Sequence, residues 1–571
     1  MATILLMLIV FFGYILAYRF YGRALARRIF NISEMTIAPS EEFNDGVDFV
    51  PTDKWVIFGH HYTSIAGTGP IVGPAIGIIW GWVPAMLWVF FGSIAIGAVH
   101  DFGALAISMR NKGQSISECA EQIVGRRVRH LFFIMVFLTL LVVIAVFAVV
   151  MANIFEAYPS SVFPMWIQIP IAIFVGRMLR AKRMNIVLIT MFGVVAMYTG
   201  IYFGESLAFT MPSFLSIPSS GVWTILLLVY CFFASTLPVH TLLQPRDYLN
   251  AWQLFVALAL LGFGVLASGL FADLKIVAPA FDLKPEGAPP MFPFLFITIA
   301  CGAISGFHSL VASGTTAKQV KTEKDMLFIG YGSMLLEGVL AVLVIIAVSA
   351  GIGMAYKTGD GRILSGFPAW KEHFVSWNSA SGMTNNLKAV IQGSSNMMKI
   401  LRVPESVGIT VMGVFIASFA GTTLDTATRV QRYVVAELFA GTRLKFFSGR
   451  YTATIIAVLT AGALAFSTGS SGAGAMKLWP LFGAINQLLA GLALLTMTVY
   501  LKKRGGLKFL VTGIPCLFML IVTIWALILN QSTVWSQGKM FLAGINIVAL
   551  FLALWMILES VLVFIKSNVK K

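Results

Sequence analysis

The sequence predicts an all-α polytopic membrane protein, and three observations support this prediction. First, 58% of the 571 residues are hydrophobic and only 11% are charged, whereas an average soluble domain has about 25% charged residues. Second, the apolar residues form runs long enough to cross a hydrocarbon layer, which takes about 20 residues of helix. Third, the basic residues lie in short clusters between these runs, as orientation signals do. A transmembrane barrel is excluded because its strands would alternate polar and apolar residues.

The apolar runs predict about fifteen transmembrane helices. They are expected at 3–19, 56–79, 83–109, 130–153, 164–179, 184–204, 222–243, 249–272, 293–316, 327–355, 406–427, 451–467, 478–500, 509–529 and 540–565.

The distribution of Lys and Arg predicts how the chain is oriented. With the N-terminus outside and the C-terminus in the cytoplasm, most of the 40 Lys and Arg fall on the cytoplasmic side, as the positive-inside rule requires. The loop 205–221, which is then external, contains no Lys or Arg. This pattern accounts for the net charge of +16 without a nucleic-acid partner. The apolar residues 1–18 precede Arg19 and Arg23, the reverse of the order in a signal peptide, so we expect them to remain as the first span.

A helix break is expected inside the second span, at 59–74. This segment contains four glycines and two prolines, which favour unwinding and remove backbone donors. Bare backbone is tolerated at membrane depth only against protein or a water-filled cavity, and in secondary transporters it lines the binding site. A close-packed glycine interface is the alternative. The candidate substrate-binding residues here are His60, His61, Ser64, Gly67, Thr68 and Gly69.

A second break is expected at 234–240, which ends in the Gln-Pro-Arg-Asp sequence at 244–247 and adds Ser235 and His240 to the candidate substrate site. It lies five spans after the first break and therefore crosses the membrane in the opposite direction. This spacing predicts a five-plus-five inverted repeat similar to the leucine-transporter fold, in which the first helix of each half is broken, with extra helices at both ends. The expected organisation is a first span and loop at 1–55, repeats at 56–204 and 222–427, external loops at 205–221 and 356–405, and accessory helices at 451–571.

Ionisable residues inside apolar spans are rare, and each is a candidate for function. Two readings stay open for the histidines: neutral core residues with hydrogen-bond partners, or proton relays and substrate contacts. No metal site is expected, because no HxxxH pair exists and no Cys pair has metal-binding spacing. Asp425 is either a coupling residue or simply paired with Arg429. The resulting candidates are His308 for substrate, and His100, Asp101, Glu337 and Asp425 for ion or proton coupling.

The hydroxyl-rich run at 313–316 suggests a second form of coupling. Ser313, Thr315 and Thr316 could complete a sodium site together with free backbone carbonyls. The coupling ion is therefore H⁺ or Na⁺, and no cofactor is expected. The loop 356–405 is read either as a packed outer cap or as a gate over the substrate path.

Several long blocks resemble the carbon starvation protein A family. They include FGHHYTSIAG at 58–67 and QPRDYLN at 244–250, and the others lie at 69–74, 80–82, 97–102, 305–308, 313–319, 330–337, 424–429, 478–483 and 486–488. The resemblance implies a bacterial inner-membrane carrier of the amino acid–polyamine–cation superfamily. It also implies uptake of peptides or pyruvate during carbon starvation, by cation-coupled symport.

Together these observations predict a secondary importer that works by alternating access. The backbone around Gly67, Thr68 and Gly69 is expected to hold a substrate carboxylate, because no Lys or Arg is expected at that depth. The alternatives are a channel, a starvation sensor, or a membrane-embedded metal-dependent enzyme. The lipid bilayer and a small-molecule or peptide substrate are the expected partners, and the oligomeric state stays open.

Overall fold

The fold is a bundle of helices with one small hairpin. The computed structural model describes residues 1–32, 37–181, 185–440 and 442–569. Its helices up to the middle of the chain are α1 (Ala2–Leu16), α2 (Pro39–Glu42), α3 (Lys54–Ile65), α4 (Gly69–Gly77), α5 (Trp82–Gly92), α6 (Ala98–Arg110), α7 (Ile116–Ile123), α8 (Arg126–Ala157), α9 (Val162–Arg180), α10 (Ile186–Tyr202), α11 (Ser219–Thr236) and α12 (Leu243–Phe271).

The second part of the chain continues in the same way. Its helices are α13 (Met291–Thr298), α14 (Gly306–Gly314), α15 (Ser333–Ser349), α16 (Phe367–His373), α17 (Trp377–Ser381), α18 (Met383–Lys399), α19 (Glu405–Ala440), α20 (Arg450–Ala465), α21 (Trp479–Lys503), α22 (Leu510–Ser536) and α23 (Met540–Val569). Strands β1 (Tyr356–Lys357) and β2 (Ile363–Leu364) pair antiparallel within the segment 356–405.

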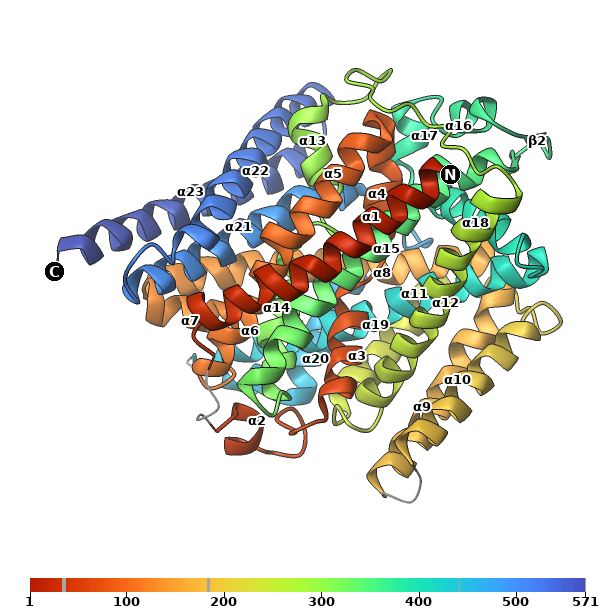
Figure 1. Cartoon of the computed structure of the whole chain (residues 1–571). Helices are drawn as coiled ribbons and strands as arrows, with labels where there is room; N and C mark the ends of the chain where they lie inside the picture. The colour runs from red at the N-terminus through yellow and green to blue at the C-terminus, as the bar shows by residue number, and fades with distance from the viewer. Residues whose placement is uncertain (33–36, 182–184, 441, 570–571) are drawn as a thin grey trace.

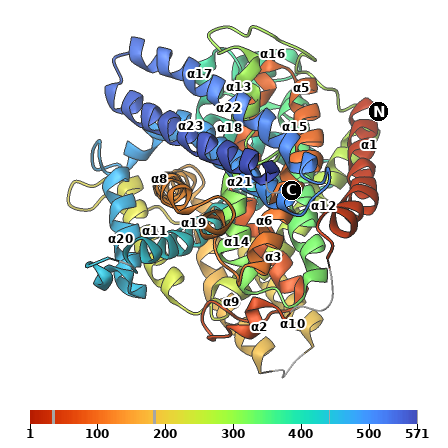
Figure 2. The same cartoon turned by 90° about the vertical axis from the view of Figure 1, so that its left-hand side faces the viewer.

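Four long helices form the centre of the bundle. The helix α8 runs for 32 residues without Gly or Pro and ends just before Pro159, because the residue before a proline disfavours the helical conformation. It packs along α19, which is 36 residues long. The most apolar stretches of the spans that contain α19, α15 and α21 are each 89% buried inside the protein. Those of the spans that contain α1 and α23 are 28% buried. Figures 1 and 2 show α1 and α23 along the outside.

The structure supports a multi-pass membrane protein but does not confirm about fifteen spans. Among the described residues, 11 helices are long and apolar enough to cross a membrane, or 12 if the bent pair α3 and α4 is one span. The expected spans 184–204 and 451–467 are the shorter helices α10 and α20. The expected span 293–316 consists of the short helices α13 and α14, separated by residues 299–305.

The second break expected from the sequence is a connection between two helices. α11 ends at Thr236 and α12 begins at Leu243. From there α12 continues unbroken to Phe271, because Pro245 lies in its first turn, where a missing backbone donor costs no helical hydrogen bond. The interruption inside an apolar run is instead at 299–305, between α13 and α14.

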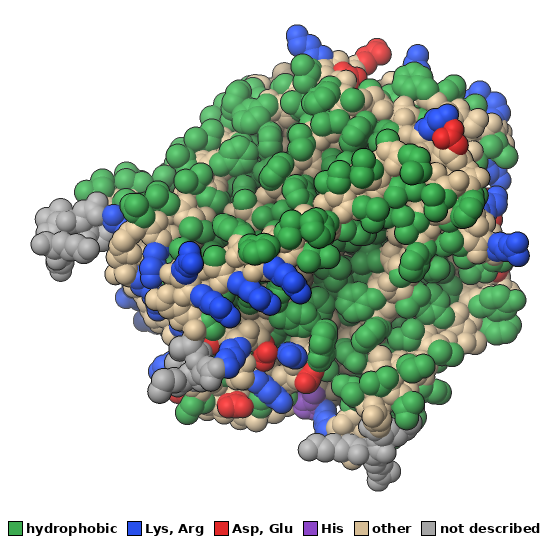
Figure 3. All heavy atoms as spheres, viewed as in Figure 1, with side chains coloured by type: hydrophobic (Ala, Val, Ile, Leu, Met, Phe, Trp, Pro, Cys, Tyr) green, Lys and Arg blue, Asp and Glu red, His purple; other side chains and the backbone are tan. Residues whose placement is uncertain are grey.

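The surface agrees with a membrane environment. On the face drawn in Figure 3, hydrophobic side chains cover a broad area, and Lys and Arg side chains gather beside it toward the lower left. The helix that begins with α1 carries four exposed arginines in its last third, Arg19, Arg23, Arg27 and Arg28.

The predicted orientation can be tested by cysteine labelling, since all four native cysteines are buried. Leu215, 80% exposed in the loop 205–221, and Leu507, 73% exposed between α21 and α22, are suitable positions. In intact cells a membrane-impermeant maleimide should label the Leu215→Cys variant but not the Leu507→Cys variant, which should react only after the cells are opened. The opposite pattern would reverse the orientation.

Candidate functional site

The interruption between α3 and α4 is present where the glycines and prolines predict it. α3 ends at Ile65, α4 begins at Gly69, and the two helices are bent by 46°. A Cβ on Gly67 would lie 2.6 Å from Thr423 Oγ1, and a Cβ on Gly69 would lie 2.5 Å from Cys301 Sγ. Both glycines therefore allow a close approach that any side chain would block.

Hydroxyls of α19 replace the helical partners that the first interruption removes. Thr423 Oγ1 donates to the carbonyl of Ser64 at 3.1 Å, and the hydroxyls of Ser64 and Thr426 lie 3.1 Å apart. The hydroxyl of Thr68, at the first turn of α4, is fully buried and has no hydrogen-bond partner among the described residues. Hydrogen bonds to α19 thus hold the interruption in place, and the hydroxyl of Thr68 is left buried without a partner among the described residues.

The second interruption, at 299–305, is held by polar side chains from two other helices. The backbone N–H of Gly302, whose φ is +90°, donates to Glu337 Oε1 at 3.0 Å. Asn486 of α21 caps α14, because its Oδ1 accepts from the N–H of Phe307 at 2.9 Å and its Nδ2 donates to Ser305 Oγ at 2.9 Å. Asn486 is a site residue that sequence reasoning did not select.

The two interruptions lie against each other. Besides the contact of Gly69 with Cys301, a Cβ on Gly73 would lie 2.6 Å from the carbonyl oxygen of Thr298 at the end of α13. A Cβ on Gly302 would lie 3.6 Å from Pro70. The two interrupted helix pairs, α3 with α4 and α13 with α14, therefore meet in the interior of the protein.

A buried group of histidines and acids lies beside the second interruption. We call it the Asp101 cluster; it consists of His100, Asp101, His308 and Glu337, all fully buried. Asp101 accepts from Nδ1 of His100 at 2.9 Å and from Nδ1 of His308 at 3.0 Å. His308 Nε2 lies 3.4 Å from Glu337 Oε2, within ion-pair distance but without hydrogen-bond geometry. The structure therefore brings together four candidates from three separate stretches of the sequence, those at 100–101, 308 and 337.

A second buried group surrounds Arg246, and we call it the Arg246 cluster. Arg246 Nη2 lies 2.7 Å from Asp247 Oδ1, and Arg246 Nη1 pairs with Asp425. His60 Nδ1 lies 2.6 Å from Asp247 Oδ2, and Tyr230 donates to Asp425 at 3.0 Å. With one arginine against two carboxylates, the group lacks one positive charge unless a proton or another cation joins it.

Two expectations from the sequence are corrected here. Asp425 pairs with Arg246 and not with Arg429. An arginine also does lie in the interior next to the candidate site, since Arg246 is 2% exposed and bonded to the partner of His60. The reason is that Arg246 lies on α12, which packs along α3, and not in a solvated loop.

Arg429 instead holds the segment before α3 against the bundle. Arg429 Nη1 and Arg432 Nη2 lie 2.6 and 3.0 Å from Asp48 Oδ1. The N–H of Val239 donates to the carbonyl of Val47, and the N–H of Thr52 donates to the carbonyl of Gln319. Burial raises the pKa of Asp48, but the Arg432 and Arg429 guanidinium groups outweigh it and bring the pKa to about 2. Asp48 is therefore ionised throughout the physiological pH range, and this contact is not a pH switch.

Four of the remaining candidates are His61 of α3 and the hydroxyl side chains of Ser313, Thr315 and Thr316. His61 Nδ1 and the Thr316 hydroxyl lie 2.9 Å apart, which links α3 to the turn that follows α14. The hydroxyls of Ser313 and Thr315 donate to carbonyls one turn earlier in α14, those of Ser309 and Val311.

Two further candidates lie outside both clusters. The Ser235 hydroxyl donates within α11, to the carbonyl of Phe232. His240 lines a surface cavity of about 350 Å³ with Arg177 and Arg180. Among the described residues, neither Ser235 nor His240 bonds to the Asp101 or Arg246 cluster.

Comparison with known proteins identifies the family of the chain. The family model described as "Carbon starvation protein CstA" matches residues 2–363 and 368–526. This chain belongs to the carbon starvation protein CstA family. It is 34% identical to the peptide transporter CstA of Mycobacterium tuberculosis, over 90% of this chain and 73% of that protein. It is 31% identical to the pyruvate/proton symporter BtsT of Escherichia coli, over 90% and 80%, and 30% identical to the peptide transporter CstA of Bacillus subtilis, over 97% and 94%.

These CstA relatives are transporters and not enzymes, and this chain is a membrane transporter of their family. Among solved structures, MhsT in complex with L-phenylalanine matches with a TM-score of 0.49 at 14% identity, over 83% of this chain and 99% of that one. A manganese transporter of Eremococcus coleocola matches with a TM-score of 0.44 at 15% identity, over 92% and 99%.

The charge balance of the Arg246 cluster predicts a large effect on stability. Replacing Arg246 with Met should leave Asp247 and Asp425 without their cation and lower the free energy of unfolding by about 3–5 kcal/mol. Thermal unfolding of the purified protein in detergent measures this as a lower Tm. Adding Asp425→Asn to Arg246→Met should recover part of the loss, because one uncompensated charge is removed.

The matched control is Arg362→Met. Arg362 is 62% exposed and pairs with Asp360 at the surface, where ion pairs contribute little, so its Tm should not change. An unchanged Tm in Arg246→Met would contradict the proposed balance of charges.

Proposed function

We propose that this membrane transporter imports a small carbon source that carries a carboxylate, a short peptide or pyruvate, together with a proton. The relatives support this substrate class, since they are named as peptide transporters and as a pyruvate/proton symporter. We further propose that the protein lies in the bacterial inner membrane with its N-terminus outside and its C-terminus in the cytoplasm. The observation that carries the proposal is the meeting of two interrupted helices beside buried, unpartnered polar groups.

The first turn of α4 is the proposed site for the substrate carboxylate. The first N–H groups of a helix have no partner inside the helix, and the helix dipole favours an anion there. In α4, Pro70 has no N–H and the N–H of Ile71 already donates to the carbonyl of Thr68, so Gly69 supplies the first helical N–H that can face an anion. Thr68 is the N-cap of this turn, and its buried hydroxyl has no partner among the described residues. The corresponding turn of α14 is already capped by Asn486, which favours α4 as the anion site.

Polar side chains in the second half of α3, the helix before this turn, are the proposed neighbours of the substrate. His60 Nε2, His61 Nε2 and the Tyr62 hydroxyl are all fully buried and lack hydrogen-bond partners among the described residues. A peptide amide or the keto group of pyruvate offers complementary donors or acceptors. Gly67 takes a smaller part than the sequence suggests, because its N–H already donates to the carbonyl of Ile65.

The Arg246 cluster is the proposed place of proton coupling. It joins α3, α12 and α19, and a proton on His60, Asp247 or Asp425 would balance its charge. Protonation from one side of the membrane and release to the other would then be linked to movement of α3. The coupling roles that the sequence suggests for His100, Asp101, Ser313, Thr315, Thr316 and Glu337 stay predictions.

A five-plus-five inverted repeat is proposed with boundaries different from those expected from the sequence. The first half would comprise α3 with α4, α5 with α6, α8, α11 and α12, and the second α13 with α14, α15, α19, α20 and α21. Each half then begins with an interrupted helix and has its longest or most central helix, α8 or α19, in third place. The hairpin of α9 and α10, with α1, α22 and α23, would be additions.

Coupling is tested by replacing Asp425 with Asn in protein reconstituted into liposomes. With an imposed proton gradient, the variant should lose uphill accumulation of labelled substrate but keep exchange of substrate across the membrane, because binding and alternation remain. Asp360→Asn, at an exposed surface pair, should behave as the wild type. Full gradient-driven accumulation in Asp425→Asn would sink the assignment, and absence of uphill accumulation in the wild type would favour a channel.

Substrate binding is tested by replacing Thr68 with Val, which keeps the shape and removes the hydroxyl. Loss of one hydrogen bond to a charged group, about 1.5–3 kcal/mol, should raise KM by roughly tenfold or more. Thr63→Val is the control, because the Thr63 hydroxyl is bonded within α3 to the carbonyl of Gly59. Competition by unlabelled pyruvate and by a dipeptide in the same assay identifies the substrate, and an unchanged KM in Thr68→Val would place the carboxylate elsewhere.

A further inference from the structure

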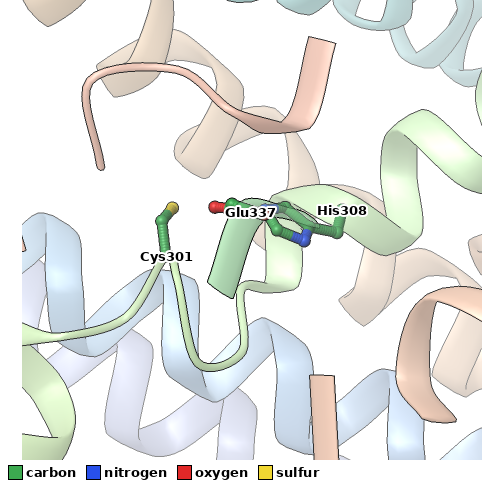
Figure 4. A group of neighbouring side chains, drawn as sticks. All are labelled: Cys301, His308 and Glu337. Atoms are coloured by element: carbon green, nitrogen blue, oxygen red, sulfur yellow. The ribbon is translucent and has the colours of Figure 1, made fainter. Parts of the chain in front are cut away.

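Three side chains that bind transition metals converge at the second interruption. Cys301, His308 and Glu337 each offer one ligand atom, and these atoms lie within 4.8 Å of one another. All three residues are buried. Figure 4 shows Cys301 on the extended segment, His308 on α14 and Glu337 on α15, with the sulfur of Cys301 and an oxygen of Glu337 directed toward each other.

The surroundings orient these groups as ligands. His308 Nδ1 is taken by Asp101 at 3.0 Å, so that Nε2 is the nitrogen directed to Glu337. Glu337 is fixed in turn, because its Oε1 accepts from the N–H of Gly302 at 3.0 Å. A carboxylate that holds the far nitrogen of a histidine, and a hydrogen bond to a ligating carboxylate, are the usual supports of metal ligands.

The inner atoms of this group have no other partner. Both His308 Nε2 and Glu337 Oε2 lack hydrogen bonds among the described residues, although they lie 3.4 Å apart and are fully buried. With Nδ1 protonated toward Asp101, Nε2 presents a lone pair, and so does the carboxylate oxygen. Two buried lone pairs that face each other are costly unless a proton or a metal ion lies between them, and the nearby thiol of Cys301 adds a third ligand that favours the metal ion.

The types of ligand select the class of cation. Thiolate, imidazole and carboxylate together are typical of Zn²⁺ and similar transition metals, whereas Mg²⁺ and Ca²⁺ prefer oxygen ligands alone. We propose that Cys301 Sγ, His308 Nε2 and Glu337 Oε2 bind one divalent transition-metal ion of the zinc class. The sequence predicts no such site, because no motif joins positions 301, 308 and 337 and the interruption at 299–305 alone brings Cys301 to the other two.

The position of the site gives the bound ion a mechanical effect. It would tie the extended segment 299–305 to α15, and Cys301 also contacts Gly69 at the start of α4. The ion would therefore brace the point where the two interruptions meet. The claim of metal binding itself does not rest on transport, because it concerns the purified chain without substrate.

The test is Co²⁺ binding to the full chain, purified in detergent with any affinity tag removed and stripped with a chelator. The wild type should bind about one Co²⁺ per chain, show a thiolate-to-cobalt charge-transfer band, and lose that band when Zn²⁺ is added. Cys301→Ser should abolish the band, and His308→Gln should lower the affinity by at least about tenfold. Cys516→Ser is the matched control, since Cys516 is also buried but lies on α22, and it should keep the band.

Thermal unfolding separates loss of ligands from loss of fold. Zn²⁺ should raise the Tm of the wild type and of Cys516→Ser, but not that of Cys301→Ser. The proposal is overturned if the wild type shows no charge-transfer band, or if the band persists in Cys301→Ser. If Cys301→Ser does not fold, Glu337→Gln is the second variant, and an unchanged Co²⁺ affinity in it would likewise overturn the proposal.

Discussion

The structure depends on one constraint, which is that backbone freed from helices in an apolar interior must find new partners. Two helices are interrupted, and each gap is held by side chains from elsewhere. Thr423 of α19 serves the carbonyl of Ser64 at the first gap. Glu337 of α15 and Asn486 of α21 serve backbone N–H groups at the second. The central helices therefore stabilise the breaks as well as the bundle, which explains why so many polar side chains lie on apolar helices.

Close packing then joins the two gaps into one place. Gly69 and Gly73 allow the first broken pair of helices to touch the second, at Cys301 and at the carbonyl of Thr298. A side chain at Gly73 would push the pairs apart, because the nearest atom is the backbone oxygen of Thr298, and a side chain at Gly69 would displace the side chain of Cys301. Polar groups freed at one gap are thus brought beside those of the other, and this meeting point is what the proposed transport site and the proposed metal site share.

The sequence predicts the membrane class and the first interruption well, because both depend on local composition. Glycine and proline mark 59–74 directly. The second interruption could not be predicted in this way, because the segment 299–305 is mostly apolar, contains no proline and has one glycine, Gly302. The pairing of Asp425 is also beyond sequence, since Arg429 lies one helical turn away while the actual partner, Arg246, is 179 residues distant. Long-range packing of α12 along α3 and α19 decides that choice, and no periodicity within α19 encodes it.

The helix α3 contacts the Arg246 cluster and the segment that follows α14 through adjacent residues. His60 bonds to Asp247 and so belongs to the Arg246 cluster, whereas His61 bonds to Thr316, two residues after the end of α14, the helix that carries His308. Neighbouring residues on a helix point about 100° apart, so one turn of α3 reaches both sides of the interior at once. A movement of α3 acts on both contacts, because one helix carries both histidines. Any conformational change that moves α3 must therefore alter the charge environment of the Arg246 cluster and the contact with α14 together. A cation bound to the Arg246 cluster would in this way also bias the contact between His61 and Thr316.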